Sequence, residues 1–374
     1  MGQGINWPRP DELMRKVASG GSLTSSEQLA LKSRSFYGPT QLLELAKGET
    51  EFNKKPQVTI MYILDRVLDE CEDGTLLLEE KLKAKNDFSY CLAEIIRREQ
   101  GSDIDDILAG EKFKNAVQLI SKGAIGDEAK VFVNEFGKGT PLREFNRFDQ
   151  KIKGSMGYAI QTMATGMENF LRQGRLESLE DLEQYSYYVA GSVGDFLTEL
   201  VELTDAVKLD TNNAQKFGRH LQLTNITKNI KEDYKAGRIY IPKNVCPEGM
   251  SLNYLMESDA QDARKARATA FEQMLSSARN TFTGSVDYVS SIPSQLSGYK
   301  AFCLVPLIMA ERTLNLMRDA GAEPVFKGEE SAIKMKGGAE QVAEIMRVSS
   351  EVAKDTSKTE ELLTELKKAA EFLF

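Results

Sequence analysis

Two acidic side chains at helical spacing are the first feature of this sequence that could do chemistry. Asp69 and Asp73 are four residues apart, so a helix would project both from one face, with Glu72 beside them. A divalent cation would relieve the repulsion between these carboxylates, and Mg²⁺ commonly takes one or two carboxylates together with waters and phosphate oxygens. A hydrated acidic face without a ligand is the alternative. Apolar residues around the acids favour a core helix that carries a metal site; they are Met61, Tyr62, Leu64, Val67 and Leu68.

A second row of oxygen-bearing side chains lies in the segment 222–233. Asn225, Asn229 and Asp233 recur every four residues, so one helix face would carry all three. Their oxygens could share one Mg²⁺ with a bound phosphate, and Lys228 and Arg238 are nearby cations. Two helices of this kind indicate a diphosphate substrate, whereas a hydrated polar face is the alternative.

Small residues follow each other at helical spacing in the segment 185–194. Ala190, Gly191 and Gly194 would share one side of a helix. Glycine inside a helix costs about 1 kcal/mol relative to alanine, so two glycines require a reason. Either another helix packs closely here, or the residues form the wall of a deep apolar tunnel.

The elements that must position these residues are predicted to be helices. Helical spacing of apolar residues recurs along the chain, and the one strand candidate, at 58–63, runs directly into a helical pattern. No polar linker divides the sequence, so we expect a single all-α domain over residues 1–374. The predicted helices cover 79–98, 143–171, 179–203, 214–234, 262–281, 299–320 and 340–352. An amphipathic helix at about 359–374 would either pack on the domain or contact a membrane surface.

Composition excludes several classes of protein. The 374 residues contain 48 Lys and Arg, 56 Asp and Glu, and one histidine, His220, so the net charge of −8 argues against a nucleic-acid partner. One histidine also excludes a multi-histidine zinc or iron site, and we expect it to be a residue of a helix surface or of the helix packing. The four cysteines are scattered and predict free thiols in a reducing compartment. The longest apolar run, 301–310, is half of the roughly 20 residues that a membrane-spanning helix needs. We therefore expect a monomer in the cytoplasm or at a membrane periphery.

Four motifs in order along the chain resemble those of the squalene and phytoene synthases, the head-to-head prenyl transferases. The segment 69–73 is similar to their DxxED motif, and 185–194 is similar to YCxxVAGxVG with Ser186 in place of cysteine. The segments 222–233 and 237–242 together resemble QxxNIxRDxxED…GRxYxP, with Lys228 and Asn229 in place of Arg-Asp. The remaining motif, SRSF, matches Ser33, Arg34, Ser35 and Phe36. The resemblance implies the isoprenoid synthase fold, with a central cavity between two acidic helices.

Two later segments resemble squalene synthases in particular. The segment 301–306 is similar to AFCxIP, while 325–328 and 333–337 are similar to VFKG…KIRKG. In squalene synthases the latter stretch lies near the region associated with NADPH, so the resemblance implies NADPH contacts for Lys327, Lys334 and Lys336. The membrane anchor of eukaryotic squalene synthases has no counterpart here, which indicates a soluble prokaryotic-type enzyme or a shortened chain.

The resemblance implies a reaction and roles for individual residues. Two farnesyl diphosphates would condense to presqualene diphosphate, which NADPH would reduce to squalene. Tyr185 would steer the leaving group or the proton. Mg²⁺, or Mn²⁺, would be held by Asp69, Asp73, Asn225, Asn229 and Asp233, and the diphosphate would contact Arg34, Arg66, Lys228 and Arg238. Further substrate contacts would come from Ser33, Ser35, Phe36, Tyr62, Val189, Ala190, Gly191, Gly194, Gln222, Phe302 and Pro306.

Some alternatives stay open at this point. Asn229 removes one negative charge from the second metal motif, which predicts a raised Mg²⁺ requirement. A synthase of the same fold that needs no reductant would yield dehydrosqualene or phytoene instead. A non-catalytic relative that binds prenyl lipids is the third possibility.

Overall fold

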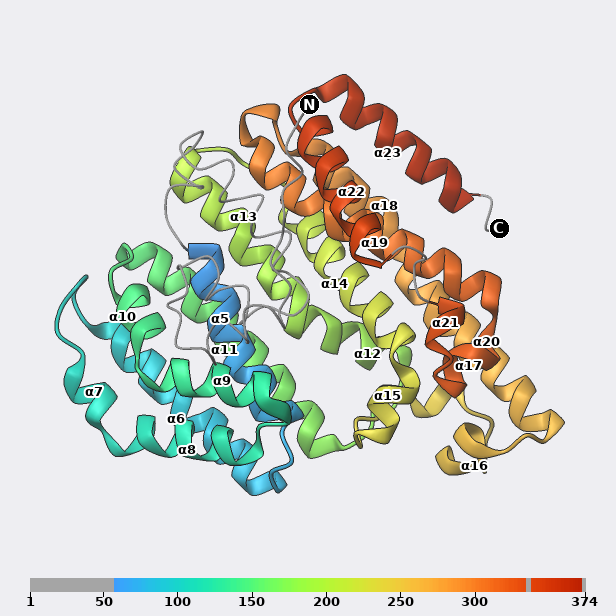
Figure 1. Cartoon of the computed structure of the whole chain (residues 1–374), viewed down its shortest axis with the longest axis horizontal. Coiled ribbons are helices and arrows are strands. Elements are labelled where there is room, and N and C mark those ends of the chain that lie inside the picture. The colour runs from blue at the N-terminus through green and yellow to red at the C-terminus, as the bar shows by residue number, and fades with distance from the viewer. Residues whose placement is uncertain (1–56, 334–337, 372–374) are drawn as a thin grey trace. The chain divides into compact units, whose positions relative to one another are not determined.

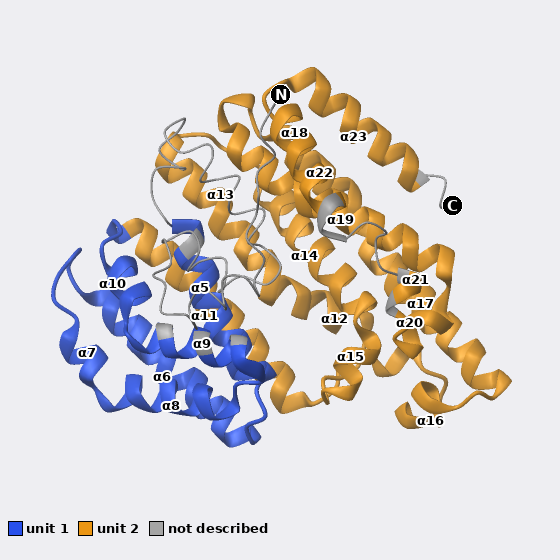
Figure 2. Ribbon diagram, in the orientation of Figure 1, with its two compact units in different colours: residues 1–41, 56–150 blue, residues 42–55, 151–374 orange. Residues whose placement is uncertain are grey.

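The computed structural model describes residues 57–333 and 338–371 (Figure 1). Every regular element in these two ranges is a helix, which confirms the all-α prediction. The motif residues Ser33, Arg34, Ser35, Phe36, Lys334 and Lys336 lie outside the described residues. The described chain divides into two compact units, shown in different colours in Figure 2, and the chain passes from one to the other at Gln150. The single domain over 1–374 stays a prediction.

Unit 1 is built around the helix that carries the first acidic motif. Its described helices are α5 (Gln57–Asp73), α6 (Leu78–Arg97), α7 (Asp105–Ala109), α8 (Glu111–Gly123), α9 (Gly126–Gly137) and α10 (Thr140–Asn146). Helix α5 packs against α6, α8 and α10. The rings of Phe88 and Phe113 lie 5.8 and 5.7 Å from that of Phe136, and all three are buried. This core joins α6, α8 and α9, and α6 and α8 in turn pack against α5, which carries the acids.

Unit 2 surrounds the helix that carries the second motif. It begins with α11 (Gln150–Gln173), α12 (Leu179–Ser186), a π-helical turn (Tyr187–Gly191), α13 (Ser192–Asp205), α14 (Thr211–Lys228) and α15 (Ile230–Lys235). It continues with α16 (Leu252–Glu257), α17 (Gln261–Asn280), α18 (Phe282–Ser291), α19 (Ser297–Ala320), α20 (Ala322–Lys327), α21 (Glu330–Ile333), α22 (Gly338–Val352) and α23 (Thr356–Glu371). Two 3₁₀ turns occupy Lys243–Val245 and Ser294–Leu296. Helix α14 contacts α12, α13, α15, α17, α18 and α19, so it is the central helix of this unit (Figure 1).

Three predicted helices are interrupted in the structure. The helix expected at 143–171 is divided between α10 and α11, and the one at 179–203 contains the π-helical turn. The helix at 214–234 is interrupted at Asn229, where φ is −98° and ψ is 16°. Apolar periodicity did not reveal these breaks because buried residues recur on both sides of each of them.

Helix α23 is the amphipathic C-terminal helix expected from the sequence. It packs against α18, α19 and α22, and Leu363 is buried. Lys367 forms an ion pair with Asp287 at 3.1 Å. Packing on the domain is therefore the alternative that the structure bears out. Among the described helices, none is both long and apolar enough to cross a membrane.

Candidate functional site

Helix α5 presents the predicted first pair of acids on its exposed surface. Asp69 and Asp73 are both exposed and one turn apart, as the sequence predicts. Glu72, by contrast, is buried, and its backbone carbonyl accepts a hydrogen bond from the Lys81 ammonium group. The accessible carboxylates of the motif are therefore Asp69 and Asp73.

Arg66 is held by a partner that the sequence analysis did not assign. Its Nε donates to Oε1 of Glu70 at 2.9 Å, Nη2 donates to the same oxygen, and the guanidinium lies 5.9 Å from the centroid of the Phe132 ring. Burial lowers the pKa of Arg66, but the charge and hydrogen bonds of Glu70 outweigh this effect and raise it overall. The i, i+4 spacing of Arg66 and Glu70 was the available signal. A phosphate contact of Arg66 stays a prediction.

Asp65 is a second feature of α5 that sequence reasoning missed. It precedes Asp69 by one turn and is only 8% exposed, and its Oδ1 has no hydrogen-bond partner among the described residues. Burial raises the pKa of Asp65, and the charge of Asp69 raises it further. Asp65, Asp69 and Asp73 thus form a row at i, i+4 and i+8, which we call the α5 carboxylate row. Tyr62, half-buried, lies one turn before Arg66 on the same helix.

In unit 2, Tyr185 belongs to a buried cluster of three aromatic rings. Its ring centroid lies 4.9 Å from that of Phe170 and 5.2 Å from that of Tyr240, and Phe170 stacks on Tyr240 at 4.7 Å. The hydroxyl groups of the two tyrosines are 3.1 Å apart. Helix α12 begins at a capping box in which Ser178 and Asp181 exchange hydrogen bonds, and this fixes the position of Tyr185. Aromatic faces of this kind attract cations.

The small residues of the third motif pack against the backbone of α14. A Cβ atom on Gly194 would lie 2.5 Å from the carbonyl oxygen of Ala214, and one on Gly218 would lie 2.2 Å from that of Ala190. Close helix packing, the first of the two alternatives, therefore accounts for Gly194. Gly191 is buried while Val189 and Ala190 are half-buried in the π-helical turn. Substrate contacts of these residues stay predictions.

The π-helical turn also positions an acid that the sequence analysis did not select. Oδ2 of Asp195 accepts a hydrogen bond from the Tyr187 hydroxyl at 3.1 Å, and Oδ1 accepts one from Nε2 of Gln215 at 2.9 Å. Burial raises the pKa of Asp195, although these hydrogen bonds oppose the shift. Burial likewise raises the pKa of Tyr187 to about 12. Both oxygens of Asp195 are thus satisfied within the protein.

The second motif keeps its helical register across the break between α14 and α15. The backbone N–H of Asn229 donates to the carbonyl of Asn225 at 3.0 Å, and that of Asp233 donates to the carbonyl of Asn229 at 2.9 Å. Nδ2 of Asn229 donates to Oδ1 of Asn225, also at 3.0 Å. We call Asn225, Asn229 and Asp233 the α14–α15 row. Gln222 and Lys228 on α14 are half-buried.

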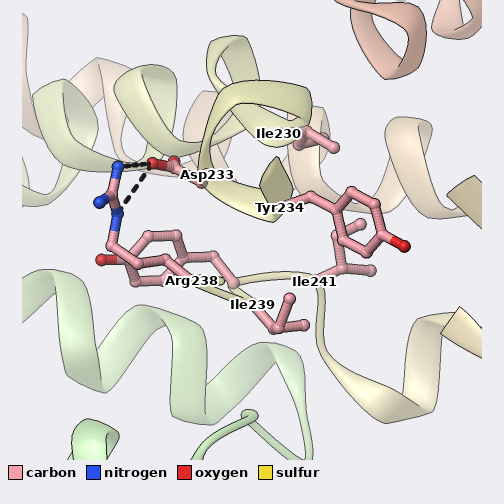
Figure 3. A pocket seen from close by; sticks show the side chains of 7 residues that line it. Ile230, Asp233, Tyr234, Arg238, Ile239 and Ile241 are labelled. Atoms are coloured by element: carbon pink, nitrogen blue, oxygen red, sulfur yellow. Dashed lines mark hydrogen bonds and ion pairs between the residues drawn. The ribbon is translucent and has the colours of Figure 1, made fainter. Parts of the chain in front are cut away.

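Asp233 and Arg238 form an ion pair at the edge of a small pocket. Nε and Nη2 of Arg238 donate to Oδ1 of Asp233 at 3.1 and 2.7 Å, as the dashed lines in Figure 3 show. The predicted metal ligand and the predicted phosphate ligand are therefore in direct contact. The pocket is lined by Ile230, Asp233, Tyr234, Arg238, Ile239, Tyr240 and Ile241.

The segment predicted to contact NADPH packs on α15. A Cβ atom on Gly328 would lie 3.1 Å from Cγ of Lys231 and 3.2 Å from Oε1 of Glu232, and φ of Gly328 is 70°, which favours glycine. Lys327 forms an ion pair with Asp259 at 3.0 Å. An NADPH contact of Lys327 stays a prediction.

Phe302 and Pro306, the two predicted substrate contacts in the segment 301–306, lie on α19. Phe302 is buried, and Pro306 is half-buried inside the helix. Their contacts with substrate stay predictions.

His220 is a buried packing residue, as predicted. Its Nδ1 lies 3.0 Å from the carbonyl oxygen of Ala278, which can only accept, so Nδ1 carries a proton. Nε2 lies 3.0 Å from Oε1 of Glu311, whose side chain is also buried. The residue joins α14, α17 and α19.

The donors of both rows fit a hard cation. Carboxylate and amide oxygens are the ligands that Mg²⁺ and Mn²⁺ take. Across 57–333 and 338–371, no three His, Cys, Asp or Glu side chains converge on a point that could hold a metal ion. A cation on either row would therefore complete its coordination with waters or with phosphate oxygens.

Comparison with known proteins gives a consistent result. A family model described as squalene/phytoene synthase matches residues 31–336. Human squalene synthase is 26% identical over 327 residues, which cover 85% of this chain and 68% of the human protein. Squalene synthase clz20 of Cochliobolus lunatus is 31% identical over 182 residues, 46% of this chain and 43% of that protein, so this match spans less than half of the fungal relative.

A solved structure shows the same fold. The complex of TcSQS with the ligand BPH1237 aligns with a TM-score of 0.67 at 22% identity, covering 92% of this chain and 89% of that one. The fold of this chain is thus the all-α fold of that protein.

Proposed function

Because this chain belongs to the squalene/phytoene synthase family, we propose that it is a squalene synthase, which condenses two farnesyl diphosphates head to head and reduces presqualene diphosphate with NADPH. The observation that carries the proposal is the family match over 31–336, which includes both rows of oxygen ligands and Tyr185. The resemblance of the segments 301–306, 325–328 and 333–337 to squalene synthases favours the reducing branch of the family.

The two rows would bind Mg²⁺, and Arg238 would bind the diphosphate of the substrate. The α5 carboxylate row and the α14–α15 row would each hold Mg²⁺, which when bound neutralises charge on a departing diphosphate. Arg238 would donate to phosphate oxygens with the same Nε and Nη2 atoms that now bind Asp233. Asp233 would then exchange an arginine for a metal ion, so its charge stays compensated in both states.

The aromatic cluster would act on the cationic stage of the reaction. Phe170, Tyr185 and Tyr240 pack within 5.2 Å of one another and exclude water from their shared faces. Ring faces attract positive charge without offering it a nucleophile. The paired hydroxyl groups of Tyr185 and Tyr240 could orient the leaving group or relay a proton.

One product analysis tests the proposal. The protein is incubated with farnesyl diphosphate and Mg²⁺, with and without NADPH, and the lipid products are separated. Squalene that forms only with NADPH supports the proposal. Dehydrosqualene in both reactions, or turnover with geranylgeranyl diphosphate alone, assigns the chain to the branch that needs no reductant. Failure to release diphosphate from any allylic substrate indicates a non-catalytic relative.

A further inference from the structure

Asp65 is a buried acid, and the packing around α5 does not explain why a carboxylate occupies this position. Its side chain is more than nine-tenths buried, and Oδ1 has no hydrogen-bond partner among the described residues. Its helical neighbours Met61 and Leu68, four residues before and three after, are buried and apolar. An aliphatic side chain would suit this position better than a carboxylate.

An ionised carboxylate at such a position is costly, and burial accordingly raises the pKa of Asp65. Taking a charge out of water costs several kcal/mol unless a partner compensates it. The adjacent cation does not supply this compensation, because Arg66 is bound to Glu70 through both Nε and Nη2. Buried polar groups that lack partners are uncommon in folded proteins, and a bound ion can supply the missing partner.

The position of Asp65 on the helix indicates what the partner is. Asp65 and Asp69 are one turn apart on one face, and two ionised carboxylates at this spacing repel each other. Asp69 is exposed whereas Asp65 is buried, so the pair joins the protein interior to the accessible surface. A cation between the two would compensate the buried charge and remove the repulsion at once.

We propose that Asp65 and Asp69 together hold a divalent cation, so that the α5 metal site extends one turn beyond the pair Asp69 and Asp73. Two carboxylates leave most of the coordination sphere to waters and to oxygens of a diphosphate, the arrangement that Mg²⁺ commonly adopts. The diphosphate rests on the proposed function, but the cation site does not.

The test measures metal binding directly. Mn²⁺ binding to the full chain is followed by electron paramagnetic resonance, with and without inorganic pyrophosphate. Asp65→Asn keeps the size of the side chain and removes its charge, and we expect it to weaken Mn²⁺ binding about tenfold or more, since even supporting residues around metal ligands change affinity 10- to 100-fold. The matched control is Asp195→Asn, because the oxygens of this half-buried acid already accept hydrogen bonds from Tyr187 and Gln215. Mn²⁺ binding to the control should equal that of the wild type.

Thermal unfolding without metal provides the second measurement. If Asp65 needs a cation to compensate its charge, Asp65→Asn and Asp65→Leu should both raise the unfolding temperature of the metal-free protein. Both variants should also reduce the further rise in unfolding temperature that Mn²⁺ gives the wild type. Equal Mn²⁺ affinity in Asp65→Asn and wild type would overturn the proposal. A lower unfolding temperature of Asp65→Leu with an unchanged Mn²⁺ effect would also overturn it, because the carboxylate would then be held by a cation of the protein. Neither result depends on whether squalene is formed, so the proposed function can fail independently.

Discussion

The two rows of oxygen ligands have the same spacing but differ in the number of carboxylates and in how far these are compensated by partners. The α5 carboxylate row has three carboxylates, and Oδ1 of its buried member, Asp65, has no hydrogen-bond partner within the described part of the chain. The α14–α15 row has one carboxylate and two amides, and its members are bonded to each other or to Arg238. A cation at the first row would neutralise up to three carboxylates, whereas a cation at the second row must displace Arg238 from Asp233. The comparison predicts that the α5 row is the stronger cation site, whereas cation binding at the α14–α15 row requires Arg238 to leave Asp233.

The largest expected effect comes from removing a carboxylate from each row. Asp69→Asn and Asp233→Asn should both reduce turnover, and Asp69→Asn should cost more, about 100-fold or greater, because Lewis-acid stabilisation contributes several kcal/mol and each 1.36 kcal/mol is tenfold in rate. Steady-state rates at saturating Mg²⁺ provide the measurement. The control is Asp106→Asn, an exposed acid of unit 1 paired with Arg98. A greater loss in Asp233→Asn than in Asp69→Asn would reverse the comparison.

Arg238 provides the next effect. Arg238→Gln should raise KM for farnesyl diphosphate about 10- to 100-fold, since hydrogen bonds to charged groups contribute ~1.5–3 kcal/mol. Arg238→Lys should rescue only part of this loss because Nε and Nη2 both donate from one planar group, which lysine cannot reproduce. The matched control is Lys243→Gln, an exposed cation of the same unit paired with Glu177. Full rescue by lysine would show that charge alone matters at this position.

The helices of both rows could be predicted from the sequence, but their partners could be predicted only in part. Apolar spacing placed Asp69 and Asp73 on one face because helical geometry is local. The pairing of Arg66 with Glu70 was also local and was overlooked, since Glu70 itself lies within the motif 69–73, which was interpreted only as a metal site. The burial of Asp65 and the contact of Gly194 with α14 depend on elements distant in sequence, so spacing alone could not reveal them. The break at Asn229 was missed because the backbone hydrogen bonds, and hence the register, continue across it.

Asn229 allows the charge of the second row to be changed directly. Asn229→Asp should lower the Mg²⁺ concentration for half-maximal activity about three- to tenfold, equivalent to ~0.6–1.4 kcal/mol. The added carboxylate binds the cation more strongly, and its repulsion of Asp233 is relieved by the same ion. Activity is measured against Mg²⁺ concentration, with Asn253→Asp as a control because this exposed asparagine lies outside both rows. An unchanged Mg²⁺ dependence would mean that position 229 does not contact the cation.

The smallest expected effect comes from removing the hydroxyl group of Tyr185 or of Tyr240, and it distinguishes a structural role of each group from a catalytic one. Tyr185→Phe and Tyr240→Phe each keep the ring and remove one side of the buried O–H···O hydrogen bond, so each should lower the free energy of unfolding by about 1 kcal/mol. If Tyr185 steers the leaving group or the proton, only Tyr185→Phe should also lower kcat. Chemical denaturation gives the first quantity and single-turnover rates give the second. Equal losses of kcat in the two variants would mean that both hydroxyl groups take part in the reaction. No loss in either variant would mean that the aromatic faces, and not the hydroxyl groups, act on the cation.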